Sequence, residues 1–380
     1  MKVCFFSPSD LSVQVLAGDT SMSGGAEAQI AHLAATLASL GHQVDLIYGD
    51  GAATGTVRSI QGVRCIDAAP RWKSWRSMRT FWKQLWKSAP DLVYARQPYD
   101  HLWMLSLFAR LSKRATFMYA LAHDFNCNPW RTFTYNAWFH QPLYAVGLYT
   151  ADIVALQHEG QRALIKPYTR AKSVLTPNLL LHIADAARTY DATTIDAIWV
   201  AKVRTDKQLD IFLDVVEALP ELSFAMVGGF DANMDPQLCT QLQQRSKTLT
   251  NLTSFGPLHA DEVLRLLAQS KVLVNTSRYE GFPNTMLEAW GQGVPVVSLT
   301  IDPGQVIQRE QLGLVSGTPE RLRHDLKRLV QIPVLNDALG ARGLAYVRRY
   351  HSLEAVCRVF EQILPSVRQA NTNAFEKGRA

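Results

Sequence analysis

Two glutamates stand on a short string whose residue types suit the binding of a sugar or a phosphate: Glu280-Gly281-Phe282-Pro283-Asn284-Thr285-Met286-Leu287-Glu288. An apolar run at 272–275 predicts a strand that ends just before the string, and Pro283 suits the first turn of a helix. We therefore expect Glu280 on the loop at the carboxyl end of the strand and Glu288 on the helix that follows. Gly281 lets the backbone approach a ligand closely, and a helix N-terminus offers free amides to an anion. Two isolated glutamates would be ordinary solvated acids, but the ordered string favours a binding site.

The string resembles the Glu-x7-Glu motif of the retaining nucleotide-sugar glycosyltransferases of family 4, which have the GT-B fold. This resemblance implies that Glu280 is a catalytic residue that contacts hydroxyls of the donor sugar. It also implies that Glu288 holds the nucleotide ribose. The backbone of the residues between them would then face the donor sugar and diphosphate: Gly281, Phe282, Pro283 (which has no N–H), Asn284 and Thr285.

Two lysines follow an expected strand at 197–200. The family has an arginine and a lysine at these places, and the two cations clamp the donor diphosphate. Lys202 occupies the arginine position and supplies a positive charge, but it cannot donate the two parallel hydrogen bonds of a guanidinium. Lys207 occupies the lysine position of the family. Both could be solvated surface lysines; the resemblance favours donor binding, more strongly for Lys207. Ala201 and Gln208 replace two family glycines, and the segment at 302–307 departs from the family pattern.

The first half of the chain carries further matches. Gly24 and Gly25 precede a helical pattern and resemble the Gly-Gly-Ala-Glu opening of the family, which implies close approach of backbone amides to the donor phosphates or the acceptor. We interpret Glu27 as an acid that stabilises the helix N-terminus.

Four polar side chains follow predicted strands, so they belong at the carboxyl edge of a sheet. His123 occupies the place of the family histidine beside sugar and acceptor, which implies a catalytic role, although a lone histidine is more often structural. Asp124 and Arg96 are candidates for acceptor binding. His158 is a weaker candidate in the same region.

Short apolar runs alternate with helical patterns along the whole chain, which predicts parallel sheets covered by helices on both faces. We expect two doubly wound Rossmann-like domains of GT-B type, with the site in the cleft between them. The predicted domains are an acceptor-binding domain at 1–178, a donor-binding domain at 179–350, and a C-terminal helix at 351–380 that packs back toward the first domain. The twelve predicted strands lie at 3–6, 44–48, 92–95, 116–120, 153–156, 173–175, 197–200, 223–227, 252–255, 272–275, 294–298 and 314–315.

The segment 71–87 combines six basic residues and no acid with four of the nine tryptophans of the chain. At helical spacing the tryptophans share one face and several cations another, which is typical of a helix in an anionic membrane interface. The alternative is a domain helix that buries its tryptophans. Nucleic acid is a third possibility without a recognised motif. The predicted membrane-facing residues are Trp72, Lys73, Trp75, Arg76, Trp82, Lys83, Trp86 and Lys87.

Composition supports this picture. The net charge of +6 resides in residues 1–180, which hold 18 basic and 11 acidic side chains. Five scattered cysteines predict neither a disulfide framework nor a thiolate zinc site, and they favour a reducing compartment. Neither a signal peptide nor a transmembrane helix is expected. We therefore expect a cytoplasmic chain, peripheral on the inner membrane face, with no metal and no nucleic-acid partner.

The predicted function is transfer of a sugar from a nucleotide diphosphate sugar to a hydroxyl of a saccharide or lipid-linked acceptor. The resemblance implies retention of configuration and a role in bacterial surface polysaccharide or lipopolysaccharide assembly. Two alternatives remain open: a nucleotide-sugar epimerase of the same fold, and a catalytically silent nucleotide-sugar-binding protein.

Overall fold

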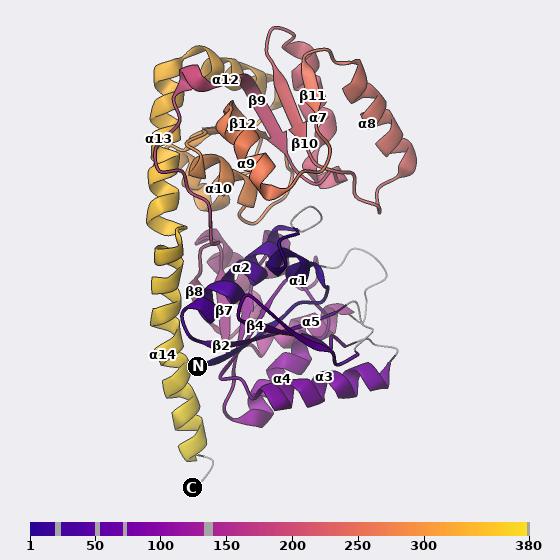
Figure 1. The fold of residues 1–380 in the computed structure, drawn as a ribbon, viewed down its shortest axis with the longest axis vertical. Coiled ribbons are helices and arrows are strands. Elements are labelled where there is room, and N and C mark those ends of the chain that lie inside the picture. The colour runs from indigo at the N-terminus through magenta and orange to yellow at the C-terminus, as the bar shows by residue number, and fades with distance from the viewer. Residues whose placement is uncertain (20–23, 50–53, 71–73, 133–139, 378–380) are drawn as a thin grey trace. The chain divides into compact units, whose positions relative to one another are not determined.

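The computed structural model describes residues 1–19, 24–49, 54–70, 74–132 and 140–377. Contacts divide the chain into two compact units (Figure 1): unit 1 comprises Met1–Leu179 and Val356–Ala380, and unit 2 comprises Leu180–Ala355. The first break lies beside the expected boundary at 178. The second lies beyond the expected 350, because a new helix begins at Leu353 and joins unit 1 only from Val356 onward.

Unit 1 contains an eight-stranded sheet in the order β3-β4-β2-β1-β5-β6-β7-β8, and every neighbouring pair is parallel except β3 and β4. The strands are β1 (Lys2–Phe6), β2 (Gln43–Tyr48), β3 (Val57–Ile60), β4 (Val63–Asp67), β5 (Leu92–Arg96), β6 (Thr116–Ala120), β7 (Ile153–Leu156) and β8 (Lys172–Leu175).

The hairpin of β3 and β4 is absent from the sequence prediction. β3 is largely exposed, so it has no continuous apolar run to mark it. Its signal is the two-residue connection Gln61-Gly62, in which both residues have positive φ, 48° and 78°. Such a turn between two short strands is the mark of a tight hairpin.

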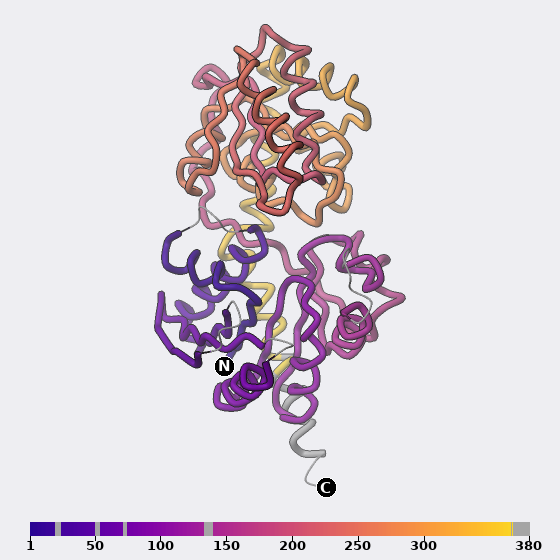
Figure 2. Tube along the Cα trace, turned by 90° about the vertical axis from the view of Figure 1, so that its right-hand side faces the viewer, coloured from indigo at the N-terminus to yellow at the C-terminus, as the bar shows by residue number. Residues whose placement is uncertain are grey.

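The helices of unit 1 cover both faces of its sheet, as the continuous apolar strands predict. Alternate residues of β1 enter different cores: Val3 and Phe5 enter one, Cys4 and Phe6 the other. The C-terminal helix packs on the first core through Val356, Phe360 and neighbouring apolar side chains, and Figure 2 shows it running alongside unit 1. The helices are α1 (Leu11–Leu16), α2 (Gly25–Ser39), α3 (Trp75–Ser88), α4 (Leu102–Ser112), α5 (His140–Tyr149), α6 (Gly160–Ile165) and α14 (Leu353–Lys377).

Unit 2 has a six-stranded, entirely parallel sheet in the order β11-β10-β9-β12-β13-β14. Because β9 and β12 are neighbours at its centre, the loops after these strands meet at one edge. The strands are β9 (Ile195–Val200), β10 (Phe224–Val227), β11 (Leu252–Ser254), β12 (Ser270–Asn275), β13 (Val296–Ser298) and β14 (Gly313–Val315). The helices are α7 (Leu209–Ala218), α8 (Pro236–Thr248), α9 (Ala260–Ala268), α10 (Asn284–Gly291), α11 (Val306–Glu310), α12 (Pro319–Gln331) and α13 (Pro333–Tyr350).

Helix α3 corrects part of the expectation for the basic aromatic segment. It begins at Trp75, and the hydroxyl of its N-cap Ser74 accepts a hydrogen bond from the Ser77 amide. Phe81 and Leu85 are fully buried, and the partly buried Trp82 packs against the same core, which leaves less of its ring exposed than that of Trp75 or Trp86. The helix needs an apolar side to attach to the sheet, and Trp82 lies on that side.

The outer side of α3 still combines cations with aromatic rings. Trp75 is 68% exposed and Trp86 is 48% exposed. Arg76, Lys83 and Lys87 are exposed on the same helix. Trp72 and Lys73 lie outside the described residues. In the described part of the chain, no helix is long and apolar enough to span a membrane. All five cysteines are free.

Candidate active site

Lys207 and Glu280 form an ion pair at the carboxyl edge of the unit 2 sheet. Lys207 ends the 3-10 turn Thr205–Lys207 after β9, and Glu280 lies on the loop after β12. Their side chains are only 12% and 14% exposed, so the pair is largely removed from water. The sequence predicted each residue in the donor site, and the structure places them in direct contact.

A buried hydroxyl ties the two loops together. Trp199 Nε1 lies 3.0 Å from Thr276 Oγ1, which in turn lies 2.7 Å from the carbonyl oxygen of Lys207. The indole N–H can only donate, so the Thr276 hydroxyl accepts from it and donates its own hydrogen to the carbonyl. Thr276 is completely buried. Sequence reasoning missed Thr276; the only signal was its position directly after a predicted strand.

A second contact holds the same loops, since the Arg278 amide donates to the Asp206 carbonyl at 2.8 Å. Between them, Gln208 adopts φ 50° at the N-cap of α7, where the family has glycine. A side chain in this left-handed region costs about 1–2 kcal/mol. The ties on either side keep the turn in place despite that cost.

Glu288 lies on α10, within the helix that follows Glu280. Burial raises the pKa of its carboxyl to about 7. The Glu288 residue is partly exposed. A carboxylate held in this way accepts hydrogen bonds from hydroxyls strongly once it is ionised.

Helix α10 begins at Asn284 with Pro283 as its N-cap, which puts the first amides of the helix beside the Glu280 loop. Gly281 and Phe282 are buried. The Phe282 ring lies 6.3 Å from that of Trp290 and 5.2 Å from that of His351. This packing fixes the loop, while Asn284 and Thr285 keep partial exposure at the helix start.

Lys202 has a different environment from Lys207. Its side chain is 53% exposed, and Nζ lies 3.0 Å from Asp231 Oδ2. Lys202 thus pairs with an acid on the loop after β10 rather than with either predicted glutamate.

Unit 1 gathers its own candidates at the carboxyl ends of its strands. His123 Nδ1 accepts a hydrogen bond from the Phe125 amide at 3.1 Å, and its ring stacks on the Phe125 ring at 5.0 Å. Because Nδ1 accepts, the proton of the neutral imidazole resides on Nε2. His123 therefore presents Nε2–H as a donor.

Asp124 follows His123 and is fixed by two donors. His158 Nε2 lies 3.0 Å from Asp124 Oδ1, and Gln161 Nε2 donates to the same oxygen at 2.9 Å. The Asp124 side chain is 40% exposed, whereas that of His158 is 8% exposed. The weaker candidate His158 thus positions Asp124. Gln161 was not anticipated.

Arg96 ends β5 and is only 6% exposed. Its Nη2 donates to Asn178 Oδ1 at 2.7 Å. Gly24 is the N-cap of α2 and Gly25 its first residue, so their backbone forms the helix N-terminus as expected. A Cβ on Gly24 would lie 2.5 Å from Glu27 Oε2, so the acid folds back over the helix start.

Family models match both halves of the chain. Residues 24–178 match the model described as "Glycosyl transferase 4-like domain", and residues 194–331 match "Glycosyl transferases group 1". The chain belongs to the glycosyltransferases. A curated relative, "Glycosyltransferase 1 domain-containing protein 1" of Xenopus tropicalis, is 25% identical over 166 residues. That match covers 43% of this glycosyltransferase and about half (47%) of the relative.

Solved structures confirm the GT-B fold of this glycosyltransferase. Sucrose-phosphate synthase from Thermosynechococcus elongatus matches with a TM-score of 0.75 and 16% identity, over 97% of this chain and 99% of that one. Anabaena HepE in complex with UDP and glucose matches with a TM-score of 0.69 and 16% identity, over 96% of this chain and 100% of that one.

Proposed function

We propose that this glycosyltransferase moves a sugar, with retention of anomeric configuration, from a nucleotide diphosphate sugar to a hydroxyl of a saccharide or lipid-linked acceptor. The observation that carries the proposal is the arrangement of Lys207, Glu280 and Glu288 at the carboxyl edge of the unit 2 sheet. The complex of HepE with UDP and glucose supports a nucleotide-sugar donor.

In this function each unit 2 group has a role. The Lys207 ammonium, joined by Lys202, stabilises the negative charge of the donor diphosphate, and the first amides of α10 add the field of a helix N-terminus. Glu280 orients hydroxyls of the donor sugar, and Glu288 binds the ribose. We propose that this charge neutralisation needs no metal ion.

The unit 1 groups serve the acceptor and the transferred sugar. His123 donates from Nε2 to a sugar hydroxyl or to the oxygen that gains charge as the bond to the diphosphate breaks. The leaving diphosphate oxygen takes the proton of the acceptor hydroxyl on the same face. Asp124 and Arg96 bind the acceptor.

The outer side of α3 supports an acceptor at a membrane. Its exposed cations Arg76, Arg79, Lys83 and Lys87 have no acidic partner among the described residues. Cations beside exposed Trp75 and Trp86 suit the interface of an anionic bilayer. We propose peripheral attachment to the inner membrane face and a role in bacterial surface polysaccharide assembly.

The test begins with a thermal-shift screen of nucleotide diphosphate sugars. A donor held at about 100 times its dissociation constant should stabilise the protein by about 2.7 kcal/mol. Lys207→Ala should abolish that stabilisation, and Glu280→Ala should abolish transfer while the circular dichroism spectrum stays unchanged. Glu320→Ala, at a 73% exposed glutamate of the same unit, is the matched control and should retain both properties.

Three results would contradict the proposal. Full transfer by Glu280→Ala would exclude its role, conversion of the donor sugar without an acceptor would identify an epimerase, and donor binding with neither transfer nor hydrolysis would identify a silent binding protein. The anomeric configuration of the product, determined by NMR, decides between retention and inversion.

A further inference from the structure

A row of alternating charges follows β9 at the carboxyl edge of the unit 2 sheet. Arg204 Nη2 donates to Asp206 Oδ2 at 2.9 Å, and Lys207 Nζ lies 3.9 Å from the same carboxylate oxygen. Lys207 in turn pairs with Glu280. Because both cations reach one oxygen, the Arg204 guanidinium lies no farther from the Lys207 ammonium than these two distances together. Two cations on either side of one anionic oxygen form a position that also suits a phosphate oxygen.

The backbone holds Arg204 in this place. Arg204 is the N-cap of the 3-10 turn Thr205–Lys207, and its carbonyl accepts a hydrogen bond from the Lys207 amide at 2.9 Å. Val203, the preceding residue, is completely buried and forms an isolated β-bridge with Phe230. The Arg204 side chain is 46% exposed, so it extends from a fixed segment toward solvent.

Lys202 lies on the other side of β9. Its Nζ lies 3.0 Å from Asp231 Oδ2 on the loop after β10, whereas Lys207 pairs with Glu280 on the loop after β12. In the sheet, β9 lies between β10 and β12. The side chain at the position of the family arginine is thus turned toward the β10 loop. The guanidinium that reaches the Lys207 side belongs to Arg204, two residues farther along the chain.

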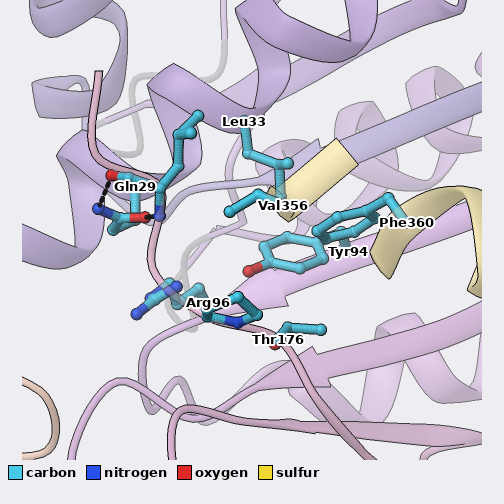
Figure 3. A pocket seen from close by; sticks show the side chains of 9 residues that line it. Gln29, Leu33, Tyr94, Arg96, Thr176, Val356 and Phe360 are labelled. Atoms are coloured by element: carbon cyan, nitrogen blue, oxygen red, sulfur yellow. Dashed lines mark hydrogen bonds between the residues drawn. The ribbon is translucent and has the colours of Figure 1, made fainter. Parts of the chain in front are cut away.

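Exposure separates Arg204 from Arg96, the candidate arginine of unit 1. In Figure 3 the Arg96 guanidinium lies on the same side of a small hollow as the amide of Gln29. Arg96 is 6% exposed, and its Nη2 donates to Asn178 Oδ1 at 2.7 Å and, in the amide orientation that satisfies both groups, to Gln157 Oε1 at 2.8 Å. Arg204 instead pairs with a carboxylate that is itself 30% exposed. An ion pair so exposed contributes little to stability, so a ligand with more charge can replace the carboxylate.

We infer that Arg204 binds the donor diphosphate together with Lys207, and that Asp206 occupies the place of a phosphate oxygen in the ligand-free protein. The inference rests on the proposed donor role of unit 2 and adds a third cation to Lys202 and Lys207. A diphosphate carries more charge than one carboxylate and offers several oxygens. The planar guanidinium can therefore donate two parallel hydrogen bonds to it, which a lysine cannot do.

A surface ion pair without a ligand role is the competing explanation. Arg204 and Asp206 are two residues apart and both partly exposed, so they could pair only because they are neighbours in the chain. The two explanations differ in the effect of removing the Asp206 charge. If Asp206 competes with the ligand for Arg204, neutralising it strengthens diphosphate binding, and the gain depends on Arg204. In a surface pair without a ligand role, the gain does not depend on Arg204.

The experiment measures nucleotide binding to the full chain by calorimetry. The probes are UDP, GDP, ADP and CDP, each compared with its nucleoside monophosphate. The wild type should bind one diphosphate about tenfold or more tightly than its monophosphate. Arg204→Gln should weaken binding of that diphosphate about tenfold and that of the monophosphate less, because it removes hydrogen bonds to a charged group. Arg204→Lys keeps the charge and should recover only part of the affinity.

Two further variants make the test specific. Asp206→Asn should strengthen binding of the same diphosphate about two- to fivefold, and most of that gain should vanish when it is combined with Arg204→Gln. Arg328→Gln, at an exposed arginine in the last turn of α12, is the matched control and should keep the wild-type affinity for both nucleotides. The melting temperature of ligand-free Arg204→Gln should equal that of the wild type, since an exposed pair stabilises the fold little.

The inference is overturned if Arg204→Gln keeps the wild-type preference for the diphosphate, or if Asp206→Asn strengthens diphosphate binding equally with and without Arg204. A lower melting temperature of Arg204→Gln with unchanged diphosphate affinity would assign Arg204 to a structural pair. A wild type that binds none of the four diphosphates, or wild-type diphosphate affinity in Lys207→Ala, would refute the proposed donor site and this inference with it. Failure of the inference alone is therefore distinguishable from failure of the proposed function.

Discussion

Lys207 and Glu280 compensate each other's charge in the ligand-free protein, in a place that is largely closed to water. In the proposed function, a bound diphosphate gives Lys207 a second anionic partner and releases Glu280 in part toward sugar hydroxyls. The pair therefore holds both side chains in place before the donor binds. Such preorganisation lowers the cost of ordering long side chains on binding.

The Thr276 hydroxyl gives a prediction that the sequence alone did not suggest. Thr276→Val leaves the Trp199 indole N–H and the Lys207 carbonyl without their buried partner, which should cost about 1–3 kcal/mol of stability. Because we propose that Lys207 contacts the donor diphosphate, the variant should also weaken binding of the nucleoside diphosphate identified in the donor screen more than that of the corresponding monophosphate. Thr276→Ser keeps the hydroxyl and should restore both properties in urea unfolding and calorimetry. Equal losses for the diphosphate and the monophosphate would argue against this positioning role.

The raised pKa of Glu288 predicts a pH dependence. The folded-state pKa of about 7 lies above the ordinary value of 4.5, so the ligand-free protein loses stability as pH rises from about 4.5 through 7. In the proposed ribose-binding role the ionised carboxylate accepts hydrogen bonds from the hydroxyls better, so affinity for the donor identified in the screen should increase from pH 6 to pH 8. Glu288→Gln should remove both trends when melting temperature and affinity are measured across this range. A wild-type affinity that is flat with pH would contradict the ribose role.

At the scale of elements, α3 divides its side chains between two tasks. One side attaches to the unit 1 core through Phe81 and Leu85, and the other presents cations with Trp75 and Trp86 to solvent. An amphipathic pattern in the sequence identified the helix. Which tryptophans remained exposed depended on which part of the apolar face packs against the sheet.

Replacing Arg76, Arg79, Lys83 and Lys87 together by Gln tests the membrane role of α3. Each cation near an anionic surface contributes about 1 kcal/mol, so binding to vesicles containing phosphatidylglycerol should fall at least tenfold in a flotation assay. The matched control replaces four exposed cations of unit 2: Lys247, Arg265, Arg321 and Arg328. Vesicle binding that survives the α3 changes, or that falls equally in the control, would refute attachment through α3.

At the scale of the whole molecule, the chain builds two units with separate cores, and its last helix returns to the first. Val356, Phe360 and Ile363 pack on the same core as β1 and α2. Residues from both ends of the chain thus stabilise unit 1, whereas the residues proposed to bind the donor all belong to unit 2 apart from the glycines that open α2.

The substitution Phe360→Ala tests whether the stability of unit 1 and donor binding by unit 2 are separate properties. Phe360 is 3% exposed, and truncating a buried phenylalanine costs about 3–5 kcal/mol. The variant should lower the thermal transition of unit 1 in calorimetry, while the donor identified in the screen still stabilises unit 2 with wild-type affinity. Val334→Ala, at an 81% exposed valine of unit 2, should change neither property. Loss of donor binding in Phe360→Ala would show that the two units do not act separately.

The local pattern of the sequence by itself determined the fold class of this protein and the elements that carry its candidate site. Continuous apolar strands alternating with helical stripes predicted two parallel α/β domains, because strands covered on both faces must be apolar throughout. The order of residues from Glu280 to Glu288 predicted the loop after β12 and helix α10, which carry the candidate site. The missed β3–β4 hairpin had an exposed strand and only a two-residue turn as its signal.

Tertiary structure alone decided which of these residues meet. The contact of Lys207 with Glu280 depends on β9 and β12 being neighbours in the sheet. The local periodicity of apolar residues does not determine the order of the strands. The same holds for the Thr276 hydroxyl between Trp199 and Lys207, and for the burial of Arg96 among neutral amides. The spacing of residues in the sequence determines which side chains lie on the same face of a strand or helix. Only the packed sheet determines the contact partners and the burial of each side chain, and hence its charge state.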